Sequence, residues 1–223
     1  KRYKGIKKKL NLSLENNIIY ISDNIGYLYS FDNKSNKIIW ATNYKLPLKS
    51  NLKISGNKII TADVNNNLIF LNKSTGEILK LIPTENITIT NDFVSNLSQY
   101  KDILFFLNSY GSLYLNDTES MNFKWSVNLN PSLNLNQSSL FNGSEVVNDG
   151  SRIIVSSNDN TFLIEAKTGT VLNEFNFSTI IKPIIHNSIG FFVTKNNLLI
   201  AINLKNFKVL YSQDITSQVA KFL

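Results

Sequence analysis

Hydrophobic and polar residues follow one another in short runs along this chain, most clearly in NNNLIFLNKSTGEILK, residues 65–80. A polar turn precedes the apolar run 68–71, and a second apolar run starts at Ile78. Between the runs, Asn72 can accept hydrogen bonds from nearby backbone, and Gly76 adopts a positive φ without steric cost. Short apolar runs bounded by such residues are typical of strands, so the segment predicts two strands joined by a tight turn.

The same pattern occurs five times in the chain. The residues equivalent to Asn72, called anchors below, are Asp32, Asn72, Asp117, Glu165 and Asn203. Successive anchors lie 40, 45, 48 and 38 residues apart, and a further apolar run precedes each unit. A period of about 40 to 45 residues with several short strands per unit indicates the blades of a β-propeller.

We therefore predict an all-β chain that forms a β-propeller of four-stranded antiparallel blades. About five blades are expected within a single partial domain, residues 1–223, as part of a larger ring. Their predicted extents are residues 10–44, 48–82, 92–128, 144–177 and 182–212. A twisted sheet with apolar residues on both faces must stack on its neighbours to bury them.

Eight residues after the anchors stand Trp40, Lys80, Trp125, Asn173 and Tyr211, with Phe175 just beyond this column. We expect the aromatic members to fill the gaps between blades, each contributing on the order of 2–3 kcal/mol when buried. In the third unit Met121 stands where the second has Gly76, so we expect that turn to have a different shape.

Composition narrows the class of protein. The chain has 43% hydrophobic residues, as globular proteins do, and no apolar run long enough to cross a bilayer. The absence of Cys excludes disulfides and thiolate metal sites. The chain has no secretory signal and does not begin with Met, so we expect it to be a piece of a longer product.

The net charge of +7 is weak evidence for an anionic partner, because Asn, Lys and Ile are abundant throughout the chain. Six basic residues lie within residues 1–9, which we interpret as a solvated segment before the first strand. Tyr3 is the only aromatic residue there, so no stacking platform for nucleic acid is expected.

No catalytic constellation is visible. His186 is the only histidine, and nothing in the sequence pairs it with a nucleophile. Asp32, Asp117 and Glu165 occupy one repeat column at turns, which favours a turn-capping role over a catalytic one. The sequence therefore predicts a protein without intrinsic catalysis, bound metal or cofactor.

Residues 128–139, NLNPSLNLNQSS, form the longest polar insertion and lie between the third and fourth units. Leu133 and Leu135 are two residues apart, so in an extended segment both point the same way. Two interpretations remain open, namely that these leucines pack inward or that they contact a partner.

The repeat resembles that of pyrroloquinoline-quinone-type (PQQ-like) propellers, Leu-x-Ala-Leu-Asp-x-x-Thr-Gly-x-x-x-Trp, with the closest copies at residues 28–40, 68–80 and 199–211. Within that class the chain resembles the BamB-like outer-membrane assembly lipoproteins, which are eight-bladed periplasmic propellers. That second resemblance rests on residues 124–135, because the family has a similar insertion with a Pro-Ser-Leu-x-Leu-Arg run after its third repeat.

The resemblance implies that the insertion docks on the periplasmic domains of a central barrel-assembly protein. The residues carried over are Leu133, Leu135 and Asn136, and Asn136 stands where the family has Arg. It further implies a non-catalytic scaffold in the periplasm, held at the outer membrane by a lipid anchor outside this chain. Unfolded outer-membrane proteins are a second implied class of partner.

Two alternatives remain. A quinone-dependent dehydrogenase shares the repeat but requires a calcium site beneath its cofactor. A generic propeller that binds or senses another molecule also shares the repeat, but it does not require the insertion at residues 128–139.

Overall fold

The computed structural model describes residues 9–85, 96–130, 144–179 and 181–219. In these residues the chain forms five sheets of four strands and one short helix, α1 (Thr216–Val219). Within each sheet the strands are antiparallel and follow one another in sequence order. The prediction of an all-β propeller built from four-stranded antiparallel blades is confirmed.

The five blades have the following strands. Blade 1 contains β1 (Leu10–Glu15), β2 (Ile18–Asp23), β3 (Tyr27–Asp32) and β4 (Lys37–Asn43). Blade 2 contains β5 (Lys53–Ser55), β6 (Lys58–Ala62), β7 (Leu68–Asn72) and β8 (Ile78–Ile82). Blade 3 contains β9 (Asn96–Tyr100), β10 (Ile103–Leu107), β11 (Ser112–Asp117) and β12 (Asn122–Asn128). Blade 4 contains β13 (Val147–Asn148), β14 (Arg152–Ser156), β15 (Thr161–Glu165) and β16 (Val171–Phe175). Blade 5 contains β17 (Ile184–His186), β18 (Ile189–Val193), β19 (Leu198–Asn203) and β20 (Val209–Asp214).

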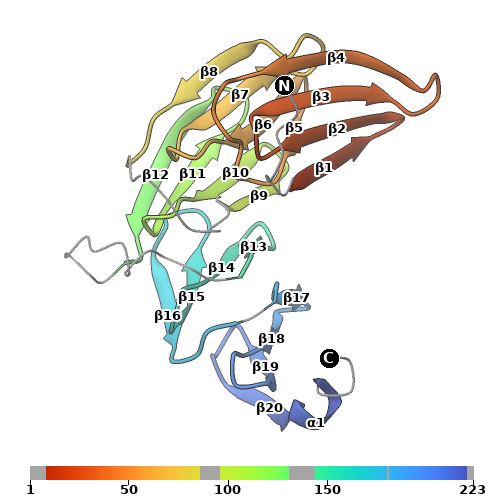
Figure 1. Ribbon diagram of the computed structural model, residues 1–223. Coiled ribbons are helices and arrows are strands. Elements are labelled where there is room, and N and C mark those ends of the chain that lie inside the picture. The colour runs from red at the N-terminus through yellow and green to blue at the C-terminus, as the bar shows by residue number, and fades with distance from the viewer. Residues whose placement is uncertain (1–8, 86–95, 131–143, 180, 220–223) are drawn as a thin grey trace.

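The blades follow one another along an arc, with blade 1 and blade 5 at its two ends (Figure 1). The first strand of each blade lies beside the first strand of the next, so β1, β5, β9, β13 and β17 form the inner side. Asparagine side chains link these inner strands. The amide of Asn51 donates to the carbonyl of Leu97 and accepts from its N–H, both at 2.9 Å, and Asn148 donates to the Ser98 hydroxyl at 2.7 Å.

Each anchor side chain caps the turn that follows it. Asn72 Oδ1 accepts hydrogen bonds from the N–H groups of Ser74, at 2.8 Å, and Thr75, at 3.3 Å. The other four anchors, Asp32, Asp117, Glu165 and Asn203, accept from Lys34, Ser120, Thr168 and Lys205 respectively. The capping role predicted for this column is therefore confirmed.

The residue four positions after each anchor has a positive φ in all five blades. The values are 75° and 77° at Gly76 and Gly169, and they are 54°, 54° and 62° at Asn36, Met121 and Phe207. The expectation that the Met121 turn is shaped differently is wrong. A non-glycine residue pays about 1–2 kcal/mol for this conformation, and Met121 offsets it by packing against the apolar cluster between blades 2 and 3.

Every blade has a β-bulge in its outer strand. In blade 1, Ser30 lies opposite Trp40 while Phe31 lies opposite Ile38, so Ile39 is left unpaired. The equivalent unpaired residues are Leu79, Lys124, Leu172 and Leu210. Such bulges raise the local twist and keep an outer strand from pairing with another chain.

Two tryptophans lock blades together, as predicted. Trp40 donates through Nε1 to the carbonyl of Lys73 in blade 2, at 3.1 Å, and its ring lies on Gly76. Trp125 makes the equivalent contact between blades 3 and 4. Its Nε1 donates to the carbonyl of Ala166 at 3.2 Å, and its ring lies on Gly169. A glycine at this turn position therefore serves both the positive φ and the close approach of the indole.

Four apolar clusters fill the four interfaces between consecutive blades. Each combines buried side chains from both blades, for example Leu28 with Leu71, Phe70 with Phe106, Phe105 with Ile164, and Leu163 with Phe192. Phe175 also packs where predicted, with its ring centroid 6.2 Å from that of Phe192 in blade 5. The core is thus divided into layers between sheets.

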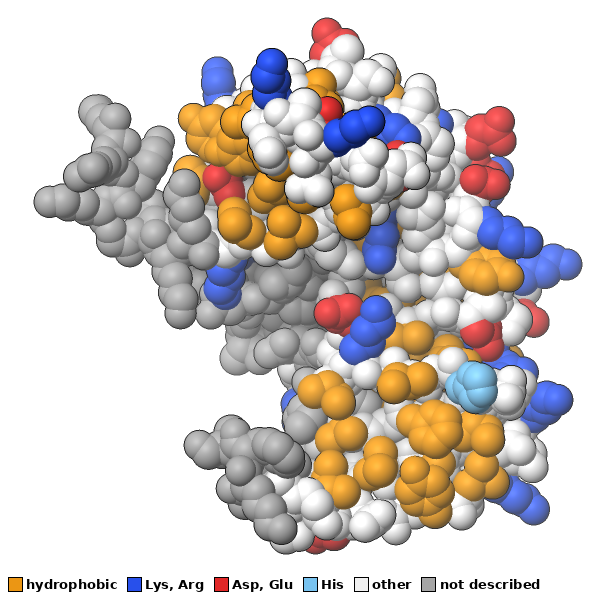
Figure 2. All heavy atoms as spheres, turned by 90° about the vertical axis from the view of Figure 1, so that its right-hand side faces the viewer, with side chains coloured by type: hydrophobic (Ala, Val, Ile, Leu, Met, Phe, Trp, Pro, Cys, Tyr) orange, Lys and Arg blue, Asp and Glu red, His pale blue; other side chains and the backbone are white. Residues whose placement is uncertain are grey.

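The two end blades each present an apolar face to solvent. In blade 1, Leu12 and Leu14 are 63% and 66% exposed. In blade 5, Ile184 is 62% exposed and Tyr211, the aromatic residue of the Trp40 column, is 43% exposed. Figure 2 shows hydrophobic side chains gathered over blade 5, in the lower half of the view. These faces match the buried faces of the other blades, as expected for part of a larger ring.

The indole contacts lead to a stability prediction. We expect Gly76→Ala and Gly169→Ala to destabilise the protein by about 2–4 kcal/mol, because the new Cβ combines left-handed strain with a clash. It would lie 2.7 Å from Trp40 Cζ3 or 2.8 Å from Trp125 Cε3. Urea and thermal unfolding measure the loss.

Gly56→Ala is the matched control. Gly56 has a φ of 56°, but no atom lies within 4 Å of an added Cβ, so only the backbone strain of about 1 kcal/mol is expected. Equal destabilisation in all three variants would contradict the role of the indole contacts.

Candidate docking surface

Each blade has two rims where its turns lie. We call one of them the connector rim, because it carries the segments that join one blade to the next. It also carries the turns between the second and third strands of the blades, at residues 24–26, 64–67, 109–111, 157–160 and 195–197. The turn rim, at the opposite strand ends, carries the anchors. β12 ends on the connector rim, and the described residues that precede the insertion lie there.

The predicted docking residues Leu133, Leu135 and Asn136 lie outside the residues that the structure describes. The two sides of the insertion are described, and both are anchored. Leu129 and Val146, 5% and 3% exposed, enter the same apolar cluster between blades 3 and 4. The described residues on both sides of the insertion therefore lie at that interface.

Polar contacts hold the stem of the insertion on blade 3. The Leu129 N–H donates to the carbonyl of Gly111 at 2.9 Å, and the Asn130 side-chain amide donates to the carbonyl of Tyr110 at 3.2 Å. On the returning side, the hydroxyls of Ser144 and Thr179 are 2.5 Å apart. The stem is thus connected to the turns of the connector rim by backbone and side-chain bonds.

A second feature of this rim is a carboxylate cluster around Glu85, in the segment after β8. Glu85 Oε1 accepts from the Ser112 hydroxyl at 2.7 Å, and Oε2 accepts from the Tyr114 hydroxyl at 2.5 Å and from Asn108 Nδ2 at 2.7 Å. The carbonyl of Glu85 accepts from Asn66 Nδ2 at 3.0 Å. No pattern in the sequence predicts this cluster, because the residues that donate to Glu85 are 19 to 29 residues away from it.

The charge of the Glu85 carboxylate is stabilised by hydrogen bonds from within the chain. Burial raises the pKa of the Glu85 carboxyl, but the hydrogen bonds from Tyr114, Ser112 and Asn108 outweigh it and hold the pKa below its ordinary value. The pKa of the Tyr114 hydroxyl is raised, mainly by burial and in addition by its hydrogen bond to the Glu85 carboxylate. With both oxygens bonded within the chain, the carboxylate fastens the connector to blade 3.

Acidic caps on the connector rim were also missed by the sequence reasoning. Asp63 Oδ1 accepts from the N–H groups of Asn65 at 2.8 Å and Asn67 at 3.0 Å. Asp23 accepts likewise from Ile25 and Tyr27. The signal that identifies them is an Asp that lies four or five residues before the strand that follows the turn, as Asp23 precedes Tyr27 and Asp63 precedes Leu68.

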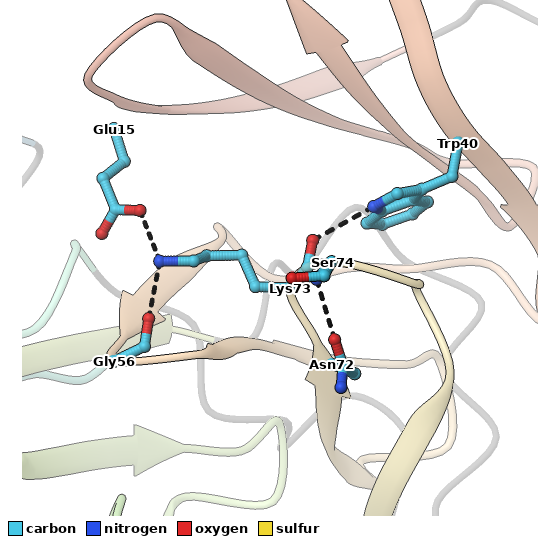
Figure 3. A network of polar contacts seen from close by, with 6 residues as sticks. All are labelled: Glu15, Trp40, Gly56, Asn72, Lys73 and Ser74. Atoms are coloured by element: carbon cyan, nitrogen blue, oxygen red, sulfur yellow. Dashed lines mark hydrogen bonds and ion pairs between the residues drawn. The ribbon is translucent and has the colours of Figure 1, made fainter.

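On the turn rim, an ion pair joins blades 1 and 2 (Figure 3). Lys73 Nζ lies 2.6 Å from Glu15 Oε2 and also donates to the carbonyl of Gly56 at 2.6 Å. The side chain thus crosses from the turn of blade 2 to the first strand of blade 1. This contact links two blades and leaves no free charge for a ligand.

The residues considered for catalysis are not brought together. Asp32, Asp117 and Glu165 lie in three different blades, each bonded within its own turn. Hydrogen bonds from the Ser35 hydroxyl and the Lys34 N–H lower the pKa of Asp32. His186 lies exposed at the end of β17, with its Nε2 3.0 Å from Asn187 Nδ2.

Within the described residues, no three His, Asp or Glu side chains lie close enough together to hold a metal ion. In the same part of the chain, no helix has the length and apolar character needed to cross a membrane. The absence of a cofactor remains a prediction from the sequence.

The stacked four-stranded blades, with their capped turns and docked tryptophans, define a PQQ-like β-propeller. A family model described as "Outer membrane protein assembly factor BamB" matches residues 7–213. The chain therefore belongs to the family of the outer membrane protein assembly factor BamB. No curated protein matches the chain.

Solved structures share the fold. BamB from Moraxella catarrhalis has a TM-score of 0.76 at 14% identity, over 92% of this chain and 63% of that one. The computationally designed protein Ika8 has a TM-score of 0.71 at 12% identity, over 95% of this chain and 63% of that one. Quinohemoprotein alcohol dehydrogenase from Comamonas testosteroni has a TM-score of 0.68 at 11% identity, over 92% of this chain and 42% of that one. The chain thus spans about 63% of the length of the BamB structure.

The Glu85 cluster leads to a pH prediction. Because the folded pKa of Glu85 lies below its unfolded value, near 4.5, its stabilising contribution is present above about pH 5 and is lost as the pH falls through the folded pKa. We expect Glu85→Gln to lower the melting temperature at pH 7 by about 2–4 °C and to have little effect near pH 3.

Thermal unfolding of both proteins from pH 3 to pH 7 measures this difference. Glu119→Gln is the control, because it makes the same substitution at an exposed side chain. A Glu85→Gln difference that stays constant over the pH range would show that the lost stability does not come from the carboxylate.

Proposed function

We propose that this chain is part of a non-catalytic scaffold in the assembly of outer-membrane β-barrel proteins. Its task in this proposal is to bind the periplasmic domains of the central barrel-assembly protein. The observation that carries the proposal is the match of the BamB family model to residues 7–213. Because fold alone does not define function, the proposal also needs a site.

The proposed site is the insertion, with Leu133, Leu135 and Asn136 as contact residues. Its anchored stem supports this choice, because Leu129 and Val146 bring both sides of the insertion to one interface of the connector rim. A segment held at both ends loses less conformational entropy on binding than a free segment does. Two leucines within a polar segment are suitable anchors, since few residues carry most of the energy of an interface.

We place the protein in the periplasm, held at the outer membrane by a lipid anchor outside this chain. The complete protein would close an eight-bladed ring, in which further blades cover the apolar end faces of blades 1 and 5. Covering Leu12, Leu14, Ile184 and Tyr211 in this way removes exposed apolar surface that favours aggregation. Unfolded outer-membrane proteins are a second class of partner in this proposal.

The alternative of a dehydrogenase fragment draws on the fold shared with quinohemoprotein alcohol dehydrogenase, at 11% identity. The repeat carboxylates argue against it, because Asp32, Asp117 and Glu165 are bonded in separate turns and do not converge. A generic binding or sensing propeller would share the blades, but the insertion gives the assembly role the stronger support.

The test is the double variant Leu133→Ala/Leu135→Ala in the full-length protein. We expect it to weaken binding to the purified periplasmic domains of the barrel-assembly protein about tenfold or more, since each apolar anchor contributes on the order of 1–3 kcal/mol. The melting temperature should be unchanged. Calorimetric titration and thermal unfolding give the two readouts.

Leu129→Ala is the matched control, because the same substitution in the buried stem should lower the melting temperature. If the double variant retains binding and has a lowered melting temperature, the two leucines are core residues and the proposed site is wrong. Full binding and full stability together would also exclude the insertion as the docking element.

A further inference from the structure

The repeats allow one position to be compared across the blade interfaces. The residue directly after an anchor faces the end of the first strand of the preceding blade. Between blades 1 and 2, Lys73 reaches Glu15 at 2.6 Å (Figure 3). Between blades 2 and 3, the hydroxyls of Thr118 and Ser55 are 2.7 Å apart. In both interfaces this position is occupied by a polar contact.

Between blades 3 and 4 the corresponding residue is Ala166, whose methyl group cannot bridge the interface. Tyr100, the counterpart of Glu15 at the end of the first strand, lies instead on Gly150, where an added Cβ would be 2.5 Å from Tyr100 Cε1. A cavity of about 280 Å³ remains at this place on the turn rim. Its floor is apolar and consists of Ile103, Leu115 and Ala166.

The mouth of this cavity is positively charged. Lys124 and Lys167 lie on it, together with one carboxylate, that of Asp117. Asp117 Oδ1 is occupied by the N–H and hydroxyl of Ser120, at 2.7 and 2.8 Å, and Oδ2 lies 4.0 Å from Lys124 Nζ. Lys167 is exposed and makes no hydrogen bond or ion pair among the described residues. The mouth thus carries the ammonium groups of Lys124 and Lys167 against the single carboxylate of Asp117, which already accepts hydrogen bonds from Ser120.

Lys124 also departs from the repeat. It is the unpaired residue of the bulge in β12, where the other four blades have Ile or Leu. Its side chain is 55% exposed, so its charge remains available to a ligand. Blade 3 therefore places the ammonium group of Lys124 beside the cavity that Ala166 of blade 4 leaves open.

We propose that this cavity, the blade 3–4 pocket, binds a peptide segment of a protein partner in which an apolar side chain is next to an acidic one. The apolar side chain enters between Ile103, Leu115 and Ala166, and the carboxylate pairs with Lys124 and Lys167. A volume of about 280 Å³ accommodates one large side chain, and the two lysines at the mouth suit an acidic residue next to it. The pocket and the insertion lie at opposite ends of β12, so this site goes beyond the proposed function and does not depend on it.

The probe is the peptide acetyl-Gly-Phe-Asp-Gly-amide, titrated into the full-length protein and followed by methyl NMR. We expect saturable shifts of the Ile103 and Ala166 methyl signals. Ile18, which has the place of Ile103 in blade 1, is the internal control and should not shift. A peptide with Asn in place of Asp, or Ala in place of Phe, should bind about fivefold more weakly or not at all.

Two variants test the pocket itself. Ala166→Leu fills the cavity and should abolish the shifts of Ile103; it is compatible with the fold because blade 5 has Leu204, 1% exposed, at the same position. Lys167→Glu reverses the charge at the mouth and should weaken binding about fivefold to tenfold. Lys34→Glu is the matched control, as Lys34 follows its anchor at the same distance in blade 1.

The proposal is overturned if the Phe-Asp peptide produces no saturable shift of Ile103 or Ala166. It is equally overturned if the Asn peptide binds as well as the Asp peptide, or if Lys34→Glu weakens binding as much as Lys167→Glu. Unchanged binding by a folded Ala166→Leu variant would locate the peptide elsewhere. Thermal unfolding of each variant establishes that it is folded.

Discussion

Each blade is a single sheet with apolar side chains on both faces, and it is stable only when both faces are covered by neighbours. Phe105 and Phe106 are adjacent in β10 and both are fully buried, one in the cluster toward blade 4 and the other in the cluster toward blade 2. Each such burial contributes on the order of 2–3 kcal/mol. Blade stacking is therefore the interaction on which the turns, bulges and tryptophans depend, since each of these features brings two sheets close enough to exclude water.

The contacts at the periphery of an interface differ more from one pair of blades to the next than the apolar contacts at its centre do. The outer contact is an ion pair between Lys73 and Glu15 in the first interface and a hydroxyl pair between Ser55 and Thr118 in the second. The partly exposed ion pair contributes about 1 kcal/mol or less. The buried hydroxyl pair is a neutral hydrogen bond, and such a bond contributes about 0.5–1.5 kcal/mol. An alanine at this place, as in Ala166, leaves a cavity without breaking the apolar layer beneath it.

Function in a repeat protein belongs where the repeat is interrupted. The anchors are equivalent in all five blades and are occupied by their own turns, which makes them structural. The insertion at residues 128–139 and the unusual residues Lys124 and Ala166 occur once each. The pocket residues and the described ends of the insertion belong to the same pair of blades, so blades 3 and 4 carry both proposed contacts while the remaining interfaces support the stack.

Local chemistry in the sequence determined the strands, the turns and the repeat, because the hydrogen bonds of Asn72 and the positive φ of Gly76 depend on neighbours within a few residues. It also identified Trp40 and Trp125 as interface residues, while the docking residues Leu133 and Leu135 lie outside the described residues and stay predictions. Only the tertiary structure decided which cluster Met121 packs against, the Glu85 cluster and the blade 3–4 pocket. Each of these depends on side chains far apart in sequence that meet only once two sheets are stacked, and their distance is set by the packing of whole blades.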